Sequence, residues 1–257
     1  MYLTNTLKCK LIKIPSGEIN NFVMLRHVKL NKEKLIISTG MSTIKEIAET
    51  LNYISKKKIF KTFNNNVKII DKKSHNFLKS RVLLMHCVTD YPVLDKFANL
   101  SAIKNFIEKF NLHVGYSDHT QDILAPIISA SYGAKYIEKH LTLDQNDNGP
   151  DHRASIEPDL FKQMVVNLRK FENMKGNGIK KVEQCEQKNI LIARKSLIAK
   201  KNIKKGDKFS YKNITAKRPG NGVSVSKIDK YLGKRAKKDY FTDDFIWDIK
   251  IKNLRND

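Results

Sequence analysis

Short apolar runs alternate with stretches of helical periodicity through the first 174 residues, and this alternation constrains the fold more than any other feature. Five apolar runs stand out: LIKI (11–14), KLIISTG (34–40), RVLLMHC (81–87), NLHVGYSDHT (111–120) and AKYIEKHL (134–141). After each run, apolar residues recur at the three- and four-residue spacing of a helix face. Strands that alternate with helices form parallel sheets with right-handed crossovers. The sequence therefore predicts an α/β fold with a parallel sheet.

Local signals indicate where the helices begin. Asn20 is predicted to cap the first helix, and Thr43 with Glu46 has the spacing of a capping box. Further helices are predicted at 100–110, 123–128 and 157–171. The segment 57–80 is rich in lysine and asparagine, and it is predicted to be an irregular surface connection.

The pattern changes after residue 174. Residues 175–192 form a Gly- and Lys-rich stretch that we interpret as a linker between a domain at 1–174 and a second domain at 193–257. The second domain has short strand-like runs and turns: SLIA (196–199), KKGD (204–207), KRPGNG (217–222) and FIWDIKI (245–251). A β-rich module of this size buries little apolar surface alone, so we expect it to lean on the first domain or on another subunit.

Composition narrows the class of protein. The 257 residues are 40% hydrophobic, which is enough for a sizeable core, and the formal net charge is +23. The positive charge is spread along the chain, which indicates a solvated surface, and no nucleic-acid-binding motif stands out. Three separated cysteines are typical of reduced thiols, and the chain has neither a membrane-spanning run nor a signal-peptide layout. We expect a cytoplasmic protein without a membrane or nucleic-acid partner.

Two histidines follow neighbouring apolar runs: His119 comes after VGYSD and His140 after IEK. Because the carboxyl ends of parallel strands meet at one edge of the sheet, both imidazoles should reach the same site. Imidazole nitrogens bind divalent metals, so the pair is a candidate metal centre. The alternative is that each is an ordinary histidine at a strand end. His86, inside RVLLMHC, is interpreted as a packing or pocket-lining residue.

The ordered motifs KIPSGE, ISTGMS, LLMHC with TDYP, GYSDHT, IEKH, GPDH and ARKS to KRPGNG resemble the sialic acid (N-acetylneuraminate) synthase family. The resemblance implies a TIM (β/α)₈ barrel followed by a small SAF domain, which is antifreeze-like with a β-clip fold. It also implies condensation of phosphoenolpyruvate with N-acetylmannosamine or a related N-acylated aminosugar, with release of phosphate. Such C–C bond-forming transferases serve carbohydrate biosynthesis.

This chain departs from the family at its start. The family's first strands, with their Glu-Ile-Gly-x-Asn-His type motif, have no counterpart here. About the last five barrel strands are therefore expected, as a partial barrel, and five strands do not close an eight-stranded wall. We expect an N-terminally truncated synthase with little or no activity alone, or one part of a split protein completed by a separate N-terminal half.

The resemblance assigns site residues one by one. His119 and His140 match the family's metal ligands, for Mn²⁺ or else Mg²⁺ or Co²⁺. Phosphoenolpyruvate would be held by four residues: Lys13, Ser16, Ser38 and Ser117. Glu18 matches the family's glutamate for proton handling. The plainer readings are that the serines cap helices or turns and that Glu18 is an exposed helix-start carboxylate.

The remaining matches concern the aminosugar. Thr89, Tyr91 and Asp151 match positions near that substrate, and Arg218 matches an arginine that one subunit presents to the active site of another. This arrangement implies a domain-swapped homodimer. The alternative for Arg218 is a surface arginine before a turn. Two other functions stay open: a non-catalytic remnant whose SAF module binds a sugar or a partner protein, and, less favoured, a basic nucleic-acid-binding protein.

Overall fold

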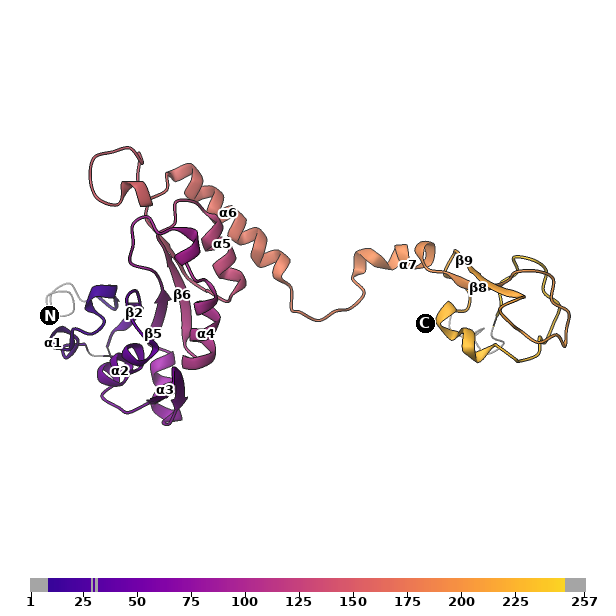
Figure 1. Ribbon diagram of the computed structural model, residues 1–257, viewed down its shortest axis with the longest axis horizontal. Helices are drawn as coiled ribbons and strands as arrows, with labels where there is room; N and C mark the ends of the chain where they lie inside the picture. The colour runs from indigo at the N-terminus through magenta and orange to yellow at the C-terminus, as the bar shows by residue number, and fades with distance from the viewer. Residues whose placement is uncertain (1–8, 29, 31, 248–257) are drawn as a thin grey trace. The chain divides into compact units, whose positions relative to one another are not determined.

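The structure, a computed structural model, describes residues 9–28, 30 and 32–247. The chain forms two compact units, Met1–Asn177 and Gly178–Asp257. Figure 1 shows the first unit with its sheet and helices and the second with its short strands.

The first unit is organised around a five-stranded parallel sheet. Its strands are β1 (Leu11–Ile14), β2 (Lys34–Ser38), β5 (Val82–His86), β6 (His113–Asp118) and β7 (Ile137–Lys139), in the order β1-β2-β5-β6-β7. All four pairings are parallel, and each new strand is added beyond the one before it. A barrel wall is wound in this way, whereas a doubly wound sheet reverses its strand order. The sheet is a curled half-barrel (Figure 1), which confirms the predicted partial barrel.

The helices that connect these strands are α1 (Phe22–Leu25), α2 (Ile44–Ser55), α3 (Lys72–Lys79), α4 (Ser101–Phe110), α5 (Leu124–Ser131) and α6 (Pro158–Lys175). The capping box of α2 is confirmed, because Thr43 and Glu46 exchange hydrogen bonds with each other's backbone. The predicted cap of α1 is wrong by one residue. Asn21, not Asn20, accepts a hydrogen bond from the Met24 amide.

The prediction of an irregular connection at 57–80 is wrong. This segment contains an antiparallel hairpin of β3 (Phe60–Phe63) and β4 (Asn66–Ile69), followed by α3. Asn64 and Asn65 form the turn with φ angles of 43° and 59°. Asparagine tolerates this left-handed conformation better than most residues do, and two such residues suit a tight hairpin turn.

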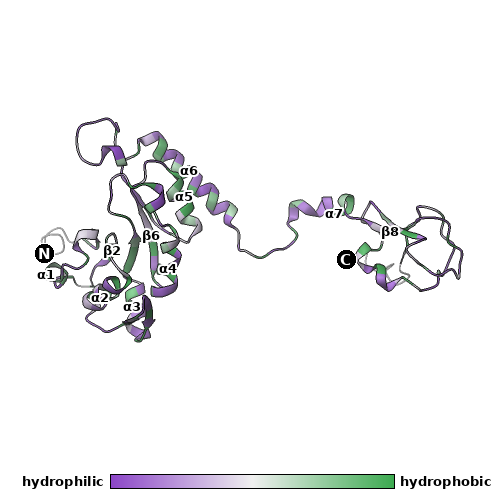
Figure 2. Ribbon diagram, in the orientation of Figure 1, coloured by the Kyte–Doolittle hydropathy of each residue, from purple (hydrophilic) through white to green (hydrophobic). Residues whose placement is uncertain are grey.

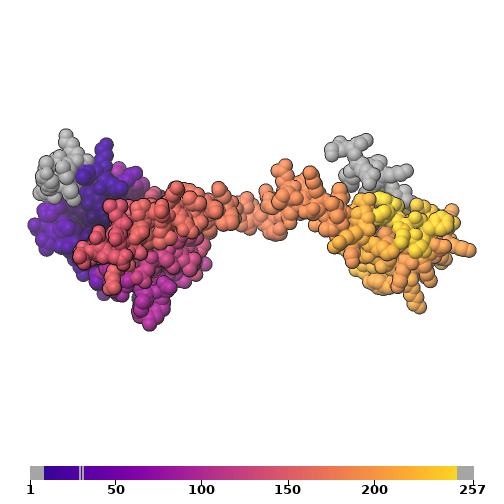
Figure 3. All heavy atoms as spheres, turned by 90° about the horizontal axis from the view of Figure 1, so that it is seen from above, coloured from indigo at the N-terminus to yellow at the C-terminus, as the bar shows by residue number. Residues whose placement is uncertain are grey.

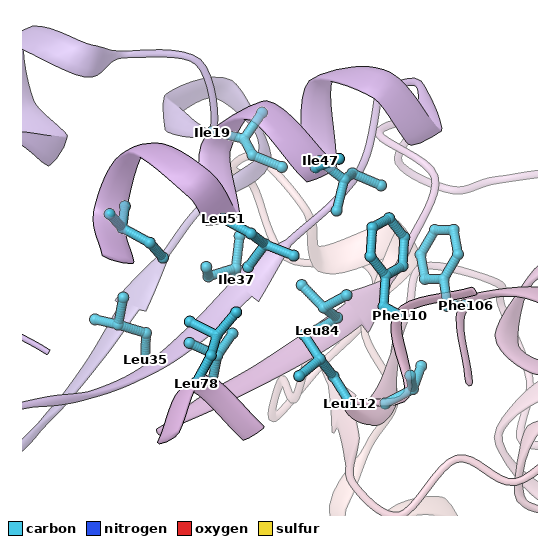
Figure 4. Close-up of a cluster of buried hydrophobic side chains, with 14 of the residues drawn as sticks. Ile19, Leu35, Ile37, Ile47, Leu51, Leu78, Leu84, Phe106, Phe110 and Leu112 are labelled. Atoms are coloured by element: carbon cyan, nitrogen blue, oxygen red, sulfur yellow. The ribbon is translucent and has the colours of Figure 1, made fainter. Parts of the chain in front are cut away.

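The core of the first unit lies between the sheet and the helices that follow its strands. Alternate residues of the strands point into it, among them Leu35, Ile37 and Leu84, and α2 and α4 cover them with Leu51 and Phe110 (Figure 4). Each fully buried side chain of this size contributes about 1.5–3 kcal/mol relative to leaving it in water. Because side chains alternate along a strand, the other residues face the inside of the half-barrel.

Helices α5 and α6 are less covered. Helix α5 is largely apolar (Figure 2), yet its residues Leu124 and Ile128 are 58% and 37% exposed. In α6, Met164 is the one buried residue, and the helix lies at the surface (Figure 3). In the described part of the chain, no helix is both long and apolar enough to cross a bilayer.

The second unit holds η5 (Gln184–Glu186), α7 (Gln187–Ala193), β8 (Ser196–Ala199), β9 (Ile214–Lys217) and η6 (Val225–Lys230). Strands β8 and β9 are antiparallel, and single bridges such as Ile198 to Phe245 extend the pairing. Its core contains Leu197, Ile203 and Ile246. Helix α7 occupies part of the segment predicted as a linker. Of the predicted strand 245–251, residues 248–251 lie outside the described residues.

Candidate active site

His119 is held by the loop that follows β5. Its Nδ1 lies 2.6 Å from the carbonyl oxygen of Val88, and its own carbonyl accepts a hydrogen bond of 2.9 Å from the Val93 amide. The ring of Tyr91 lies against the imidazole, with 4.1 Å between centroids. A carbonyl can only accept, so Nδ1 carries the proton and Nε2 is the nitrogen left for a ligand.

His140 follows β7 and lies beside His119. The two ring centroids are 5.4 Å apart with the planes almost perpendicular, at 84°. Tyr91 also contacts His140, at 5.6 Å, and a carboxylate oxygen of Asp151 is 3.9 Å from His140 Nδ1. The structure thus brings together four residues that the sequence assigned to the metal and the aminosugar.

A second group lies inside the half-barrel next to this pair. Glu138 Oε1 accepts hydrogen bonds from Lys13 Nζ at 2.8 Å and from Ser117 Oγ at 2.7 Å. Ser117 Oγ is also 3.5 Å from Nε2 of His119. Lys13 and Ser117, assigned to phosphoenolpyruvate, therefore share one carboxylate.

The Lys13–Glu138 contact measures how strongly the sheet curls. Lys13 is on β1 and Glu138 on β7, the two edge strands. In a flat sheet these strands would be about 19 Å apart, four spacings of about 4.8 Å. The side-chain ends instead meet at 2.8 Å, so the wall bends around an interior that these residues face.

The electrostatics of the site favour a neutral imidazole and an ionised carboxylate. Burial lowers the pKa of His119, the Val88 hydrogen bond opposes this shift, and the charge of a protonated His140 adds to it. Burial alone would raise the pKa of Glu138, but hydrogen bonds from Lys13 and Ser117 outweigh it and lower the pKa. A neutral His119 keeps a lone pair available for a cation.

The opposite face of β6 and β7 carries a buried ion pair. Asp118 and Lys139, register partners on the two strands, are 2.7 Å apart with both side chains fully buried. Asp118 also accepts hydrogen bonds from the Tyr116 hydroxyl and from the amide and hydroxyl of Thr120. This network fixes the two strand ends from behind, since Ser117 and Glu138 point the other way.

The ends of β1, β2 and β5 meet in a third cluster. Ser16 Oγ accepts a hydrogen bond of 3.0 Å from the Gly40 amide and lies 3.3 Å from Cys87 Sγ. A Cβ atom on Gly40 would be 2.2 Å from Thr89 Oγ1 and 2.8 Å from Ser16 Oγ, so a larger residue at this position would require these side chains to move. Ser38, buried at the end of β2, is two residues from Gly40.

Glu18, Arg218 and His86 make contacts of their own. Glu18 accepts a hydrogen bond from the Asn21 side chain within its own segment. Arg218 belongs to the second unit, where its Nε donates to the Ala193 carbonyl. His86 is buried beside Tyr116 and bonded to the Ala98 carbonyl, so it packs in the interior.

Sequence reasoning missed Glu138 and the Asp118–Lys139 pair. IEKH was considered for its histidine alone, although strand alternation places Glu138 on the same face as His140. That alternation was the available signal for Glu138. The pairing of Asp118 with Lys139 depends on strand register, for which no local signal exists.

The residues present fit a divalent metal as a two-nitrogen site. Among the described residues, no group of three or more His, Cys, Asp and Glu side chains could hold an ion. The Nδ1 hydrogen bond of His119 to a carbonyl is the outer-shell contact that metal-binding histidines commonly make. Two imidazoles with the other positions left to water and substrate suit a Lewis-acid site.

Residues 1–180 match the family model described as the NeuB family. The chain belongs to the NeuB family. Residues 194–246 match the SAF domain. The resemblance to the sialic acid synthases with a C-terminal SAF domain is therefore confirmed. The synthases of this family are C–C bond-forming transferases.

Relatives of this NeuB-family chain share most of its length. It is 45% identical over 245 residues to the N,N'-diacetyllegionaminic acid synthase of Campylobacter jejuni, covering 95% of this chain and 68% of the relative. It is 35% identical to a pseudaminic acid synthase of the same species, covering 88% and 60%. The crystal structure of N-acetylneuraminic acid synthetase from Leptospira borgpetersenii superposes with a TM-score of 0.57 at 29% identity, covering 70% and 56%. The chain thus spans between half and about two thirds of these relatives' lengths.

Proposed function

We propose that this chain forms part of the active site of a nonulosonate synthase, which condenses phosphoenolpyruvate with an N-acylated aminosugar and releases phosphate. One observation carries the proposal: the perpendicular His119–His140 pair lies beside the Lys13–Glu138–Ser117 group inside the half-barrel. A cation site next to a lysine and a hydroxyl suits a reaction between a carbonyl and a phosphorylated enol.

The proposed ligand of the two histidines is Mn²⁺, with Mg²⁺ or Co²⁺ as alternatives. A divalent cation at Nε2 of His119 and at His140 would polarise the aldehyde carbonyl of the aminosugar. The ring of Tyr91 contacts both imidazoles, with centroid distances of 4.1 Å to His119 and 5.6 Å to His140. Asp151, whose carboxylate is 3.9 Å from His140 Nδ1, would accept hydrogen bonds from sugar hydroxyls.

Lys13 and Ser117 are proposed to hold the anionic groups of phosphoenolpyruvate. An ammonium and a hydroxyl at neighbouring positions are suitable donors to phosphate or carboxylate oxygens. Both donate to Glu138 in this structure. On substrate binding, the single O–H of Ser117 would turn from Glu138 to an oxygen of phosphoenolpyruvate, whereas the ammonium of Lys13 has two further N–H donors. The C3 carbon then attacks the aldehyde carbon, water adds at C2, and phosphate leaves. Positioning and electrostatic stabilisation account for most of the rate enhancement.

We further propose that the chain alone turns over little substrate. The side chains of Lys13 and Glu138 are 33% and 42% exposed, so water has access to the anion-binding group. Charge interactions weaken in water, and a solvent-exposed site neither excludes bulk water nor fixes the position of the water that reacts. Cytoplasmic location and a homodimer in which Arg218 serves another subunit remain predictions.

The first test is metal binding. Titration of Mn²⁺ into the purified chain, followed by the electron paramagnetic resonance signal of the free ion, should give one saturable site. His119→Ala and His140→Ala should each abolish it, while His27→Ala, an exposed histidine on another segment, should not. Equal binding by all four proteins would contradict the proposal.

The second test is turnover. Phosphate release from phosphoenolpyruvate plus N-acetylmannosamine, or the legionaminate-type aminosugar, should be negligible for the chain alone. Addition of the part of the Campylobacter jejuni relative that this chain does not span should restore it. Release that is metal-independent, or unaffected by His140→Ala in the reconstituted mixture, would sink the assignment.

A further inference from the structure

The second unit contains a cavity that has no part in the proposed active site. Its volume is about 240 Å³, and the residues around it come from three segments: 209, 227–237 and 240–247. Lys227, Lys230, Lys234, Arg235 and Lys237 surround it, and the aromatic rings of Phe209, Tyr231, Tyr240 and Trp247 complete the lining.

The cations of this cavity are not neutralised by nearby carboxylates. Within the described part of the chain, none of the four lysines forms an ion pair, and Arg235 donates to the Gly206 carbonyl. Residues 194–246 contain 16 Lys and Arg against 5 Asp and Glu. A concave surface lined by one sign of charge concentrates ligands of the other sign, so the cavity selects an anion.

The aromatic side chains give the cavity a firm apolar base. Phe209 and Tyr240 are buried and pack edge to face, with 5.9 Å between ring centroids. Tyr231 packs against Phe209 at 6.2 Å. Trp247 is 41% exposed and therefore offers a ring face to a ligand. An apolar ring surface beside cations suits a molecule that is partly anionic and partly carbon skeleton.

The backbone of the cavity is tied by hydrogen bonds. The Phe209 amide donates to the Lys234 carbonyl at 2.9 Å, and the Gly233 amide donates to the Phe209 carbonyl at 2.8 Å. The Ala236 amide donates to the Asp207 carbonyl at 2.8 Å. The segment that carries Lys234 and Arg235 is thus fixed to the 207–209 segment, and binding needs little ordering of the main chain.

Size and exposure limit the ligand to one sugar-sized molecule. At roughly 30 Å³ per water, the cavity holds the volume of about eight water molecules. A single-stranded nucleic acid instead needs several exposed aromatic faces along a groove. Here Phe209 and Tyr240 are buried, which leaves Trp247 as the well-exposed ring of the lining.

We infer that this cavity binds a carboxylate-bearing monosaccharide, the chemical class of product that a nonulosonate synthase releases. The choice of a sugar carboxylate over other small anions rests on the proposed function. The selection of an anion rests on the cavity alone. The carboxylate is held by the lysines of 227–237, and the sugar ring lies against Trp247.

Trp247 supplies the assay because it is the one tryptophan of the chain. N-acetylneuraminate titrated into the full chain should change the tryptophan fluorescence in a saturable way, and added salt should weaken the binding. The uncharged sugar N-acetylmannosamine should give no saturable change at the same concentrations. Isothermal calorimetry measures the same binding without relying on the fluorophore.

Variants identify the site. Lys230→Gln with Lys234→Gln should weaken binding at least about tenfold, the scale of one charge-assisted hydrogen bond. Lys212→Gln removes an exposed lysine of the same unit that does not line the cavity, and it should bind like the parent chain. Circular dichroism confirms that each variant is folded, which is expected because all three lysines are exposed.

The outcomes separate this inference from the proposed function. The absence of saturable N-acetylneuraminate binding by both methods overturns the inference. An equal change in Trp247 fluorescence with N-acetylmannosamine or with inorganic phosphate also overturns it. Binding of a single-stranded oligonucleotide that N-acetylneuraminate fails to displace also overturns it. If the chain binds the sugar acid but fails the Mn²⁺ test, the anion-binding cavity is supported and the proposed synthase function is refuted. If the chain binds Mn²⁺ but not the sugar acid, the proposed function is supported and the inference about the cavity is refuted.

Discussion

Replacing Asp118 by Asn should destabilise the first unit far more than any change at the exposed ion pairs. The carboxylate of Asp118 lies 2.7 Å from Lys139 Nζ, and neither side chain has any exposed surface. Asn keeps the shape but removes the charge. The ammonium of Lys139 then stays buried without a counter-charge, which costs several kcal/mol.

The expected loss is about 3–5 kcal/mol, the range for breaking a buried pair by removing one partner. Domains are stable by only about 5–15 kcal/mol, so much of the stability of the unit would disappear. With a urea dependence of about 2 kcal/mol per molar, a loss of 4 kcal/mol lowers the unfolding midpoint by about 2 M. Lys139→Met should cost a similar amount, and the double variant should cost less than the sum of the two.

Urea unfolding followed by far-ultraviolet circular dichroism measures these changes. The signal reports mainly on Met1–Asn177, where α1 to α6 lie, whereas Trp247 fluorescence reports on the second unit. Lys45→Gln is the matched control, because its pair with Glu49 is 3.9 Å long and 71% and 51% exposed. A loss below about 1 kcal/mol in Asp118→Asn, or strict additivity in the double variant, would refute the reasoning.

Three further predictions use other parts of the same unit. Gly40→Ala should cost about 1–3 kcal/mol in urea unfolding, because its Cβ would lie 2.2 Å from Thr89 Oγ1, and adding Thr89→Ala should recover part of it. Burial lowers the pKa of His86, so the folded chain binds fewer protons than the unfolded chain. The stability should therefore fall as the pH drops below about 6.5. The urea midpoint of His86→Gln should depend less on pH over that range. Glu138→Gln should change the stability by less than about 1 kcal/mol, since the ion pair of Glu138 with Lys13 is partly exposed. The same substitution should lower the pKa of His119, measured by a nuclear magnetic resonance titration, because the charge of the Glu138 carboxylate raises that pKa. A stable Gly40→Ala chain, an unchanged pH profile or an unshifted His119 would contradict the respective prediction.

The sheet was predictable because its strands are buried and read as continuous apolar runs. LIKI and KLIIS became β1 and β2, and the run before His119 became β6. The hairpin at 60–69 is not evident from the sequence because each strand has only four residues, FKTF and NVKI, and two of the four are polar. Asparagines such as those at 64 and 65 are common in irregular loops and also in tight hairpin turns, so they do not distinguish the two.

The histidine pair was predictable from topology alone, since both residues follow adjacent parallel strands. The hydrogen-bond and ion-pair partners of the site residues were not predictable in this way. Which nitrogen of His119 is protonated depends on the path of the loop carrying Val88, and the contact of Lys13 with Glu138 depends on the curl of the whole sheet. Both contacts depend on how segments distant in the sequence pack against each other, which no short stretch of sequence determines.

The partner that orients His119 is a main-chain carbonyl, and this has a consequence for how the protein can vary. Every residue type carries that oxygen, so replacing Val88 leaves the acceptor in place. An insertion or deletion between Cys87 and Val93 would move it. Natural variation around this histidine should therefore tolerate exchanged side chains at position 88 while conserving the length of the loop.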